Sequence, residues 1–162
     1  MIKIGSARIN TNIFLAPLSG CSDLAFRLIA REEGAKFCFF EMVDANALIR
    51  NYEKTLCMLK TIKKDSPIAA QLLGADPAVT LDAAQKLVSI RDVSFLDINS
   101  ACPVRKVVRK GAGAHLLQKP DLLCRILKKL SSSLKIPVTV KIRTGYNKKD
   151  IKNIIHTARE CE

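Results

Sequence analysis

The chain has 162 residues, of which 48% are hydrophobic and 26% are charged, and its formal net charge is +12. This composition is typical of one globular domain and excludes a disordered tail, a collagen-like fibre and a disulfide-stapled mini-protein. No apolar run approaches the roughly 20 residues that span a bilayer, and the first residues lack a secretory signal pattern. We therefore expect a soluble cytoplasmic protein without a membrane partner.

Apolar runs and helical patterns alternate along the chain. Five apolar runs predict strands, in chain order 13–16, 37–40, 68–72, 93–98 and 137–142. The segments between them predict helices, in chain order 23–33, part of 44–60, one opening at Asp76-Pro77, one starting at Asp121 and a last one over 151–158. Residues 99–120 predict a long loop or short helical turns. Ser22 is the expected N-cap of the first helix, and Gly34 the residue after its end.

The alternation of strand and helix determines the predicted fold class, which is α/β. Continuous apolar strands are typical of a parallel sheet buried on both faces, and right-handed crossovers leave an open doubly wound sheet or a (β/α)8 barrel. No glycine-rich GxGxxG motif follows the first strand, which argues against a dinucleotide-binding open sheet. As a barrel, the chain supplies about five βα units of an incomplete TIM barrel.

Polar side chains gather at the carboxyl ends of the predicted strands. This edge is where α/β proteins build their active sites. The side chains concerned are, in chain order, Ser19, Glu41, Gln71, Asn99, Cys102, Lys141 and Arg143.

The distributions of cysteines and charges indicate which kinds of site and partner the chain can have. The six cysteines include no CxxC pair, and neither of the two histidines has a suitably spaced cysteine, so we expect no metal site. The net charge is +2 over residues 1–81 and +10 over residues 82–162. Such an excess indicates either a polyanionic partner or a solvated basic surface, and charge alone does not separate the two.

Four segments resemble the tRNA-dihydrouridine synthase family, most of all its bacterial B-type branch. They are LAPLSGCSDLAFR (15–27), AAQLLGADP (69–77), LDINSACPVRKVVRKGAGAHLL (96–117) and VTVKIRTG (138–145). The resemblance runs through essentially the whole chain, and its third segment is long and specific.

This resemblance implies a fold, a reaction and its participants. The family folds as a (β/α)8 barrel followed by a helical tRNA-binding domain, so residues 1–162 would be the N-terminal part of an FMN-binding barrel. The rest of the barrel and the helical domain would lie beyond residue 162. The implied reaction reduces uridine in tRNA to 5,6-dihydrouridine with NADPH as electron donor, hydride passing from FMN to C6 and a proton from Cys102 to C5. We expect a monomer that binds tRNA.

The resemblance also assigns residues. It makes Cys102 the catalytic residue and Asn99 a residue that helps to hold the target uracil. The implied flavin contacts are Pro17, Leu18, Ser19, Gln71 and Lys141. The residues expected near the approaching tRNA are Arg105, Lys106, Arg109, Lys110 and Arg143.

These residue types suit the chemistry. An ordinary thiol is mostly protonated at neutral pH and can donate a proton, Lys141 would offset negative charge on a reduced flavin, and four cations within 105–110 would bind phosphates without reading bases. Gln71 would hydrogen-bond the flavin or be satisfied within the core. The sequence has Ser100-Ala101 where the family has Met-Gly, and the added Cβ of Ala101 is expected to shift the cysteine loop slightly.

Two other functions remain open at this stage. The chain could belong to another FMN barrel, a dehydrogenase of free pyrimidines, although the basic run at 105–110 argues against that. It could also be an inactive truncated fragment that at most binds RNA, with an unpaired strand edge and no phosphate site. On this view the chain alone would be poorly folded and inactive.

Overall fold

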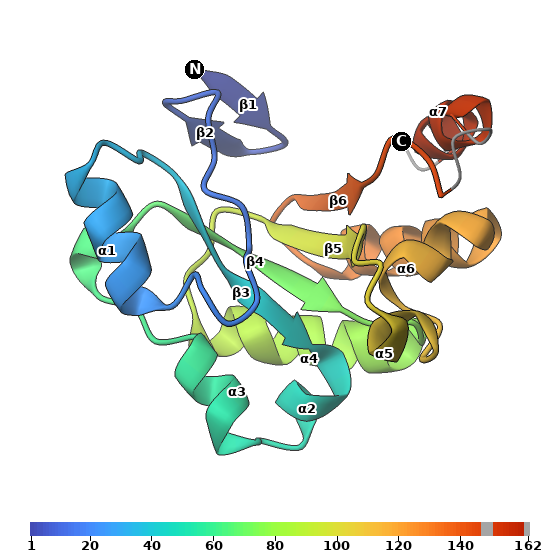
Figure 1. Cartoon of the computed structure of the whole chain (residues 1–162), viewed down its shortest axis with the longest axis horizontal. Helices are drawn as coiled ribbons and strands as arrows, with labels where there is room; N and C mark the ends of the chain where they lie inside the picture. Colours follow the sequence, from blue (N-terminus) through green and yellow to red (C-terminus); the bar gives the residue numbers. More distant parts are fainter. Residues whose placement is uncertain (147–150, 161–162) are drawn as a thin grey trace.

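A four-stranded parallel sheet forms the centre of the molecule. The structure is a computed structural model and describes residues 1–146 and 151–160. The strands lie in the order β3 (Cys38–Asp44), β4 (Ile68–Leu73), β5 (Leu96–Ser100) and β6 (Val138–Ile142), which is also their order along the chain (Figure 1). Sequential parallel strands joined by helices are the arrangement of a barrel wall, and they agree with the predicted α/β class.

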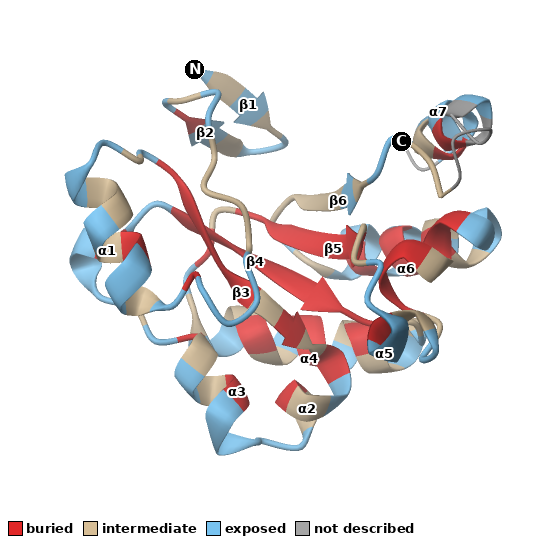
Figure 2. Ribbon diagram, in the orientation of Figure 1, coloured by how far each residue is buried: buried red, intermediate tan, exposed pale blue. Residues whose placement is uncertain are grey.

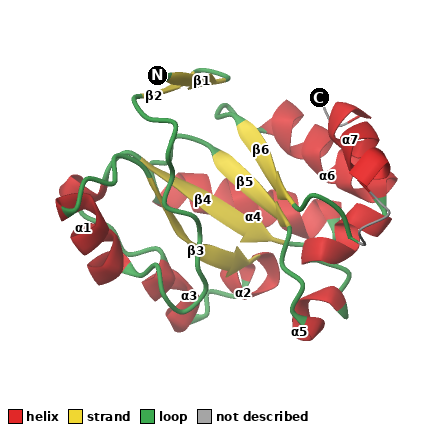
Figure 3. Ribbon diagram, turned by 45° about the horizontal axis from the view of Figure 1, so that its top comes forward, coloured by secondary structure: helices red, strands yellow, loops and turns green. Residues whose placement is uncertain are grey.

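Helices connect the strands, and the longest of them cover one face of the sheet (Figure 3). Their bounds are α1 Leu24–Glu32, α2 Ala45–Ile49, α3 Glu53–Met58, α4 Pro77–Ile90, α5 Arg105–Val108, α6 Pro120–Ser133 and α7 Ile151–Glu160, with short 3₁₀ turns at Lys63–Asp65 and Gly113–Gln118. The main apolar core lies between this face and α4 and α6, which contribute Leu87 and Ile126 to it (Figure 2). The predicted helices are thus present, and the long loop at 99–120 holds α5 and the second 3₁₀ turn.

The predicted strand at 13–16 is wrong as an element. The segment contacts the sheet through one isolated parallel bridge between Leu15 and Cys38, supported by Leu15 N–H donating to Phe37 O at 2.9 Å and Phe39 N–H donating to Leu15 O at 3.2 Å. Pro17 follows and has no N–H with which to continue a ladder. Ile13 is 77% exposed, so the start of the run is not buried either.

An antiparallel hairpin at the N-terminus was not predicted. Its strands, β1 (Ile2–Ile4) and β2 (Ala7–Ile9), have three residues each, too short for a readable alternation, and Gly5 turns between them at φ +55°. Ile9 of the hairpin packs on an aromatic cluster formed by Phe37, Phe39 and Phe95. Phe37 and Phe95 stack with centroids 5.5 Å apart. This cluster fills the inner face of the sheet at the amino ends of its strands.

The first helix begins one residue later than expected. Asp23, not Ser22, caps α1, because Asp23 Oδ1 accepts from Phe26 N–H at 2.9 Å. The Ser22 hydroxyl is used by the preceding loop, where it accepts from Leu18 N–H at 2.9 Å and donates to Leu18 O at 3.0 Å. Gly34 follows the helix at φ +100°, as predicted.

A buried ion pair ties α1 to the segment before β4. The side chains of Arg27 and Asp65 are both 0% exposed and meet at 2.8 Å. Arg27 also donates to Ser22 O at 2.6 Å and Lys60 O at 2.8 Å, and its guanidinium lies 4.9 Å from the centroid of the Phe40 ring. Because its charge is paired and each of its three guanidinium nitrogens donates a hydrogen bond in the interior, this arginine has a structural role.

Candidate active site

A row of polar side chains crosses the inner face of the sheet above the aromatic cluster. Gln71 of β4, Asp97 of β5 and Thr139 of β6 are register partners on neighbouring strands. Gln71 Nε2 donates to Asp97 Oδ2 at 2.6 Å, and Thr139 Oγ1 donates to Asp97 Oδ1 at 2.7 Å. Alternation along β5 explains the row, since Leu96 and Ile98 face the helices and Asp97 and Asn99 face inward.

The next inward residue of β5 joins this row to the cysteine loop. Asn99 Nδ2 donates to Gln71 Oε1 at 2.8 Å and lies 3.4 Å from Met42 Sδ. Its Oδ1 accepts from the backbone N–H groups of Ala101 at 3.0 Å and Cys102 at 2.9 Å. Three of the predicted site residues, Gln71, Asn99 and Cys102, are therefore brought together by direct hydrogen bonds.

Cysteine 102 is held from its other side as well. Its carbonyl oxygen accepts from Ala114 N–H at 2.9 Å, and Gly113, at φ +61°, lies so close that an added Cβ would stand 2.6 Å from that oxygen. The loop that follows the basic run 105–110 thus folds back onto Cys102 and requires glycine at position 113. The thiol itself is half-buried.

The expected effect of Ala101 on the loop is small. Among the described residues Asn51 is the only one other than glycine with a positive φ, so Ala101 does not occupy a backbone region that favours glycine. The Ser100 hydroxyl, fully buried behind it, has no hydrogen-bond partner within the described part of the chain.

An open pocket of about 390 Å³ lies on the inner face next to the polar row. Its walls are mostly apolar and include Phe39, Phe95 and Val140. Pro17 and Lys141, both predicted flavin contacts, line it together with Asp97. Lys141 is exposed, because β6 is the edge strand of the described sheet.

The carboxylate in this pocket is perturbed. Burial raises the pKa of Asp97 above its ordinary value, and the hydrogen bonds from Thr139 and Gln71 and the charge of Lys141 oppose that rise without cancelling it. Asp97 and Thr139 were not predicted as site residues. A signal was available, because an aspartate two positions before Asn99 on a buried strand faces the same side.

The loop after residue 16 is fixed by a glutamate. Glu41, which is buried in β3, accepts a hydrogen bond from Gly20 N–H through Oε2. Leu18 and Ser19 lie on this loop with exposed side chains, and they do not line the pocket that Pro17 lines.

The predicted tRNA-contacting cations lie apart from the polar row, on the surface. Arg105, Lys106 and Arg109 are exposed on and just after α5, and Arg143 is exposed after β6. Lys110 differs from them, since its Nζ pairs with Asp44 Oδ2 at 3.2 Å. Asp44 also caps α2, so this pair joins the basic loop to the end of β3.

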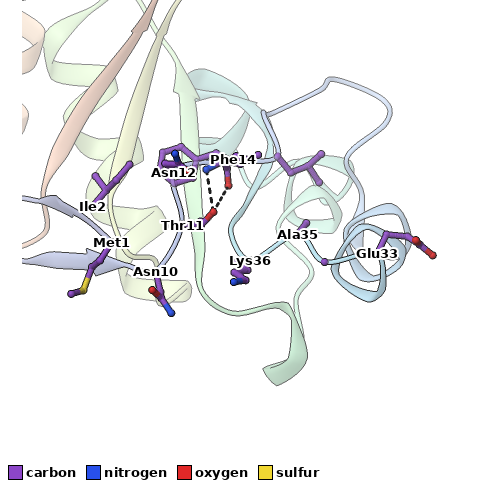
Figure 4. A pocket seen from close by; sticks show the side chains of 12 residues that line it. Met1, Ile2, Asn10, Thr11, Asn12, Phe14, Glu33, Ala35 and Lys36 are labelled. Atoms are coloured by element: carbon purple, nitrogen blue, oxygen red, sulfur yellow. Dashed lines mark hydrogen bonds between the residues drawn. The ribbon is translucent and has the colours of Figure 1, made fainter.

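A larger cavity lies elsewhere and lacks comparable chemistry. It measures about 910 Å³ and is lined by the hairpin, residues 10–15 and residues 33–36 (Figure 4). These segments precede the sheet strands, so the cavity is at the amino ends. Glu33 points away from the other labelled side chains in Figure 4. The Thr11 hydroxyl donates to Ile13 O at 3.3 Å and accepts from Ile13 N–H at 3.1 Å. The candidate site is therefore the smaller pocket with its polar row.

Two further features of the described residues bear on the site. They hold no group of three or more His, Cys, Asp or Glu side chains able to bind a metal ion. None of their helices is both long and apolar enough to cross a membrane.

Curated relatives resemble the chain along nearly its full length. A protein named tRNA-dihydrouridine synthase B from Pasteurella multocida (strain Pm70) is 40% identical over 161 residues, which are 99% of this chain and 48% of the relative. The protein of the same name from Escherichia coli (strain K12) is 33% identical over 162 residues, covering 99% and 50%. A probable tRNA-dihydrouridine synthase from Treponema pallidum (strain Nichols) is 37% identical over 150 residues, covering 90% and 44%. The chain thus spans about half the length of these relatives.

A family model described as dihydrouridine synthase (Dus) matches residues 14–162. The domain of this family is a TIM barrel, which confirms the predicted fold class and identifies the four-stranded sheet with its helices as part of a barrel wall. The matched residues include the whole polar row, the cysteine loop and Lys141. The chain belongs to the dihydrouridine synthase family.

Proposed function

We propose that the chain is the N-terminal part of a tRNA-dihydrouridine synthase that reduces uridine in tRNA with FMN as cofactor and NADPH as electron donor. The observation that carries the proposal is the anchoring of Cys102. Asn99 accepts from its backbone N–H and Ala114 donates to its carbonyl, directly after β5 at the carboxyl edge of the parallel sheet, and the row that holds Asn99 continues to Asp97 in the pocket. That edge is where barrel enzymes do their chemistry.

The residues around the pocket fit a flavin ring. Apolar walls formed by Phe39, Phe95 and Val140 suit a flat aromatic group, and its volume of about 390 Å³ lies in the range of small-molecule sites. Lys141 places a positive charge at the rim, which suits a ring that becomes negative on reduction. When bound, the flavin supplies the hydride that reduces the C5–C6 double bond of uracil.

The chain's own residues bind, orient and protonate. Cys102 donates its thiol proton to uracil C5, and the two backbone hydrogen bonds fix where the thiol stands. The Gln71 amide keeps one donor and one acceptor position with which it can orient a polar ring edge, whereas the Asn99 amide is fully used in holding the cysteine backbone and Gln71. Because the base is stacked inside a folded tRNA, it must be extruded to reach this site.

The exposed cations provide the tRNA contact. Arg105, Lys106 and Arg109 form a cluster on the loop that also carries Cys102, and Arg143 follows β6 at the same edge. Such side chains bind phosphates without reading bases, and binding should weaken with salt. A cation-rich entrance beside the cysteine favours a polynucleotide substrate over a free pyrimidine. The contact requires no membrane or metal.

The decisive experiment uses the whole gene product in which residues 1–162 occur. We expect it to purify with bound flavin and to restore dihydrouridine to tRNA lacking it, and we expect Cys102→Ala to abolish that restoration while flavin stays bound. Cys57→Ala is the matched control, because Cys57 is exposed on α3 and lies outside the polar row and the loop that carries Cys102. Absence of flavin, or full activity of Cys102→Ala, would contradict the proposal. Activity on free uracil with none on tRNA would identify a pyrimidine dehydrogenase instead.

A further inference from the structure

One buried charged residue at the site has no role in the proposed reaction. Asp97 is 4% exposed in the middle of β5, and none of the functions implied by the resemblance falls on it. Burying a carboxylate is unfavourable unless hydrogen bonds compensate for the lost water. Its position in the polar row therefore requires an explanation beyond packing.

The hydrogen bonds of the row have a fixed direction that starts at the cysteine loop. The backbone N–H groups of Ala101 and Cys102 can only donate, so Asn99 must present Oδ1 to them. The Nδ2 group of Asn99 is then turned away from the loop. It donates to Gln71 Oε1 at 2.8 Å.

Gln71 transmits the same direction to the next strand. With Oε1 turned to Asn99, its Nε2 faces Asp97 and donates to Oδ2 at 2.6 Å. Asp97 must therefore accept at this atom, and its other oxygen accepts from Thr139 at 2.7 Å. An apolar side chain at position 97 would leave the Gln71 N–H unpaired in the interior, which favours rotation of the amides away from the backbone donors.

We propose that Asp97 is a positioning residue for Cys102: as the terminal acceptor of the row, it fixes the orientation of the Gln71 and Asn99 amides and so holds the backbone of the cysteine. The functional importance of this positioning rests on the proposed function, in which Cys102 is the proton donor. The positioning itself requires a hydrogen-bond acceptor at position 97 and not a charge. Asparagine at position 97 meets this requirement, because its carbonyl can accept from Gln71 while its NH₂ group donates to the Thr139 hydroxyl.

Hydrogen exchange at the Ala101 and Cys102 amides tests the proposal in the whole gene product. We expect Asp97→Leu, of similar size but without an acceptor, to speed exchange at both amides by about tenfold or more, because their acceptor is no longer held. We expect Asp97→Asn to stay within about twofold of the wild type. The matched control is Thr80→Val, which removes a hydroxyl that is fully buried and donates to Asp76 O outside the row.

Two results would overturn the proposal. One is exchange in Asp97→Leu no faster than in Thr80→Val, which would make the row a passive part of the core. The other is exchange in Asp97→Asn as fast as in Asp97→Leu, which would make the charge the essential property. If Asp97→Leu does not fold, Asp97→Asn decides alone, since unchanged exchange supports the proposal and faster exchange overturns it. The measurement needs neither flavin nor tRNA, so it stands even if the proposed function fails.

Discussion

Two buried polar clusters in this chain compensate the charge of a buried carboxylate in different ways. Around Arg27, a carboxylate and a guanidinium neutralise each other, and both side chains are completely excluded from solvent. Around Asp97, a single carboxylate is held by two neutral donors, and it lines an open pocket. The first cluster is closed, whereas the second leaves a charge partly compensated beside a space that can be filled.

The difference distinguishes a cluster with a structural role from a cluster that belongs to the candidate site. Each of the three guanidinium nitrogens of Arg27 donates a hydrogen bond, to Asp65, Ser22 O or Lys60 O, and the side chain is 0% exposed, so it does not reach a ligand. The Gln71 amide beside Asp97 keeps one donor and one acceptor position after its bonds to Asp97 and Asn99 are counted, whereas both donors and both acceptor positions of Asn99 are used. Spare hydrogen-bonding capacity at a strand edge marks the second cluster as the site.

The largest effect is expected from breaking the closed cluster. Arg27→Met leaves Asp65 buried with much of its compensation removed, and we expect the free energy of unfolding to fall by about 3–5 kcal/mol. Denaturant unfolding of the variant measures this. A smaller loss is expected for Arg31→Met, because Arg31 is 11% exposed and contacts Asp65 Oδ1 at 3.1 Å. Equal losses in the two variants would contradict the closed-cluster description.

A pair of threonine variants compares the clusters directly. Thr139 and Thr61 each donate to the buried aspartate of their cluster, at 2.7 Å and 3.1 Å. Thr139→Val removes one of the two donors of Asp97, so we expect a loss of about 1.5–3 kcal/mol, the range for hydrogen bonds to charged groups.

The matched Thr61→Val change should be milder, because both arginines still hold Asp65. Thermal unfolding of the two variants side by side gives the comparison. A larger loss in Thr61→Val would show that the Arg27 cluster is the less completely compensated one.

Asp97 should contribute to the pH dependence of stability. Because burial raises its pKa in the folded protein, the native state keeps a proton that the unfolded chain releases above about pH 4. Stability is therefore fully present below that pH and declines as the pH rises through the folded pKa. We expect Asp97→Asn to remove this decline, so the variant gains stability relative to the wild type as the pH increases. Parallel unfolding curves with a pH-independent difference would contradict this.

Much of the fold was predictable because its signals are local. Apolar runs found four of the five predicted strands, and the cap at Asp76-Pro77 found the start of α4, where Asp76 Oδ1 accepts from Ala78 and Val79 N–H. The prediction of a strand at 13–16 is wrong for a non-local reason. A strand exists only through its neighbours, and residues 13–16 make one bridge.

The site was predictable in its members but not in their connections. The resemblance indicated Gln71, Asn99 and Cys102, whereas their hydrogen bonds depend on the register of β4 against β5, which no local pattern encodes. Asp97 is not predictable as a site residue from a motif, because a single charge in a buried strand has no motif of its own. Lys110 was predicted as a tRNA contact, and its pairing with Asp44 joins residues 66 positions apart.

The smallest effect is expected at a polar group that belongs to neither cluster. Ser100 is fully buried on the helix-facing side of β5, and its hydroxyl has no partner among the described residues. Removing an unpaired buried hydroxyl recovers its desolvation penalty, so we expect Ser100→Ala to raise the free energy of unfolding by about 1 kcal/mol. Ser22→Ala is the control, because its hydroxyl is equally buried but bonded to Leu18, and it should lose stability. If both variants lose stability equally, the Ser100 hydroxyl has a hydrogen-bond partner in solution and is not an unsatisfied buried group.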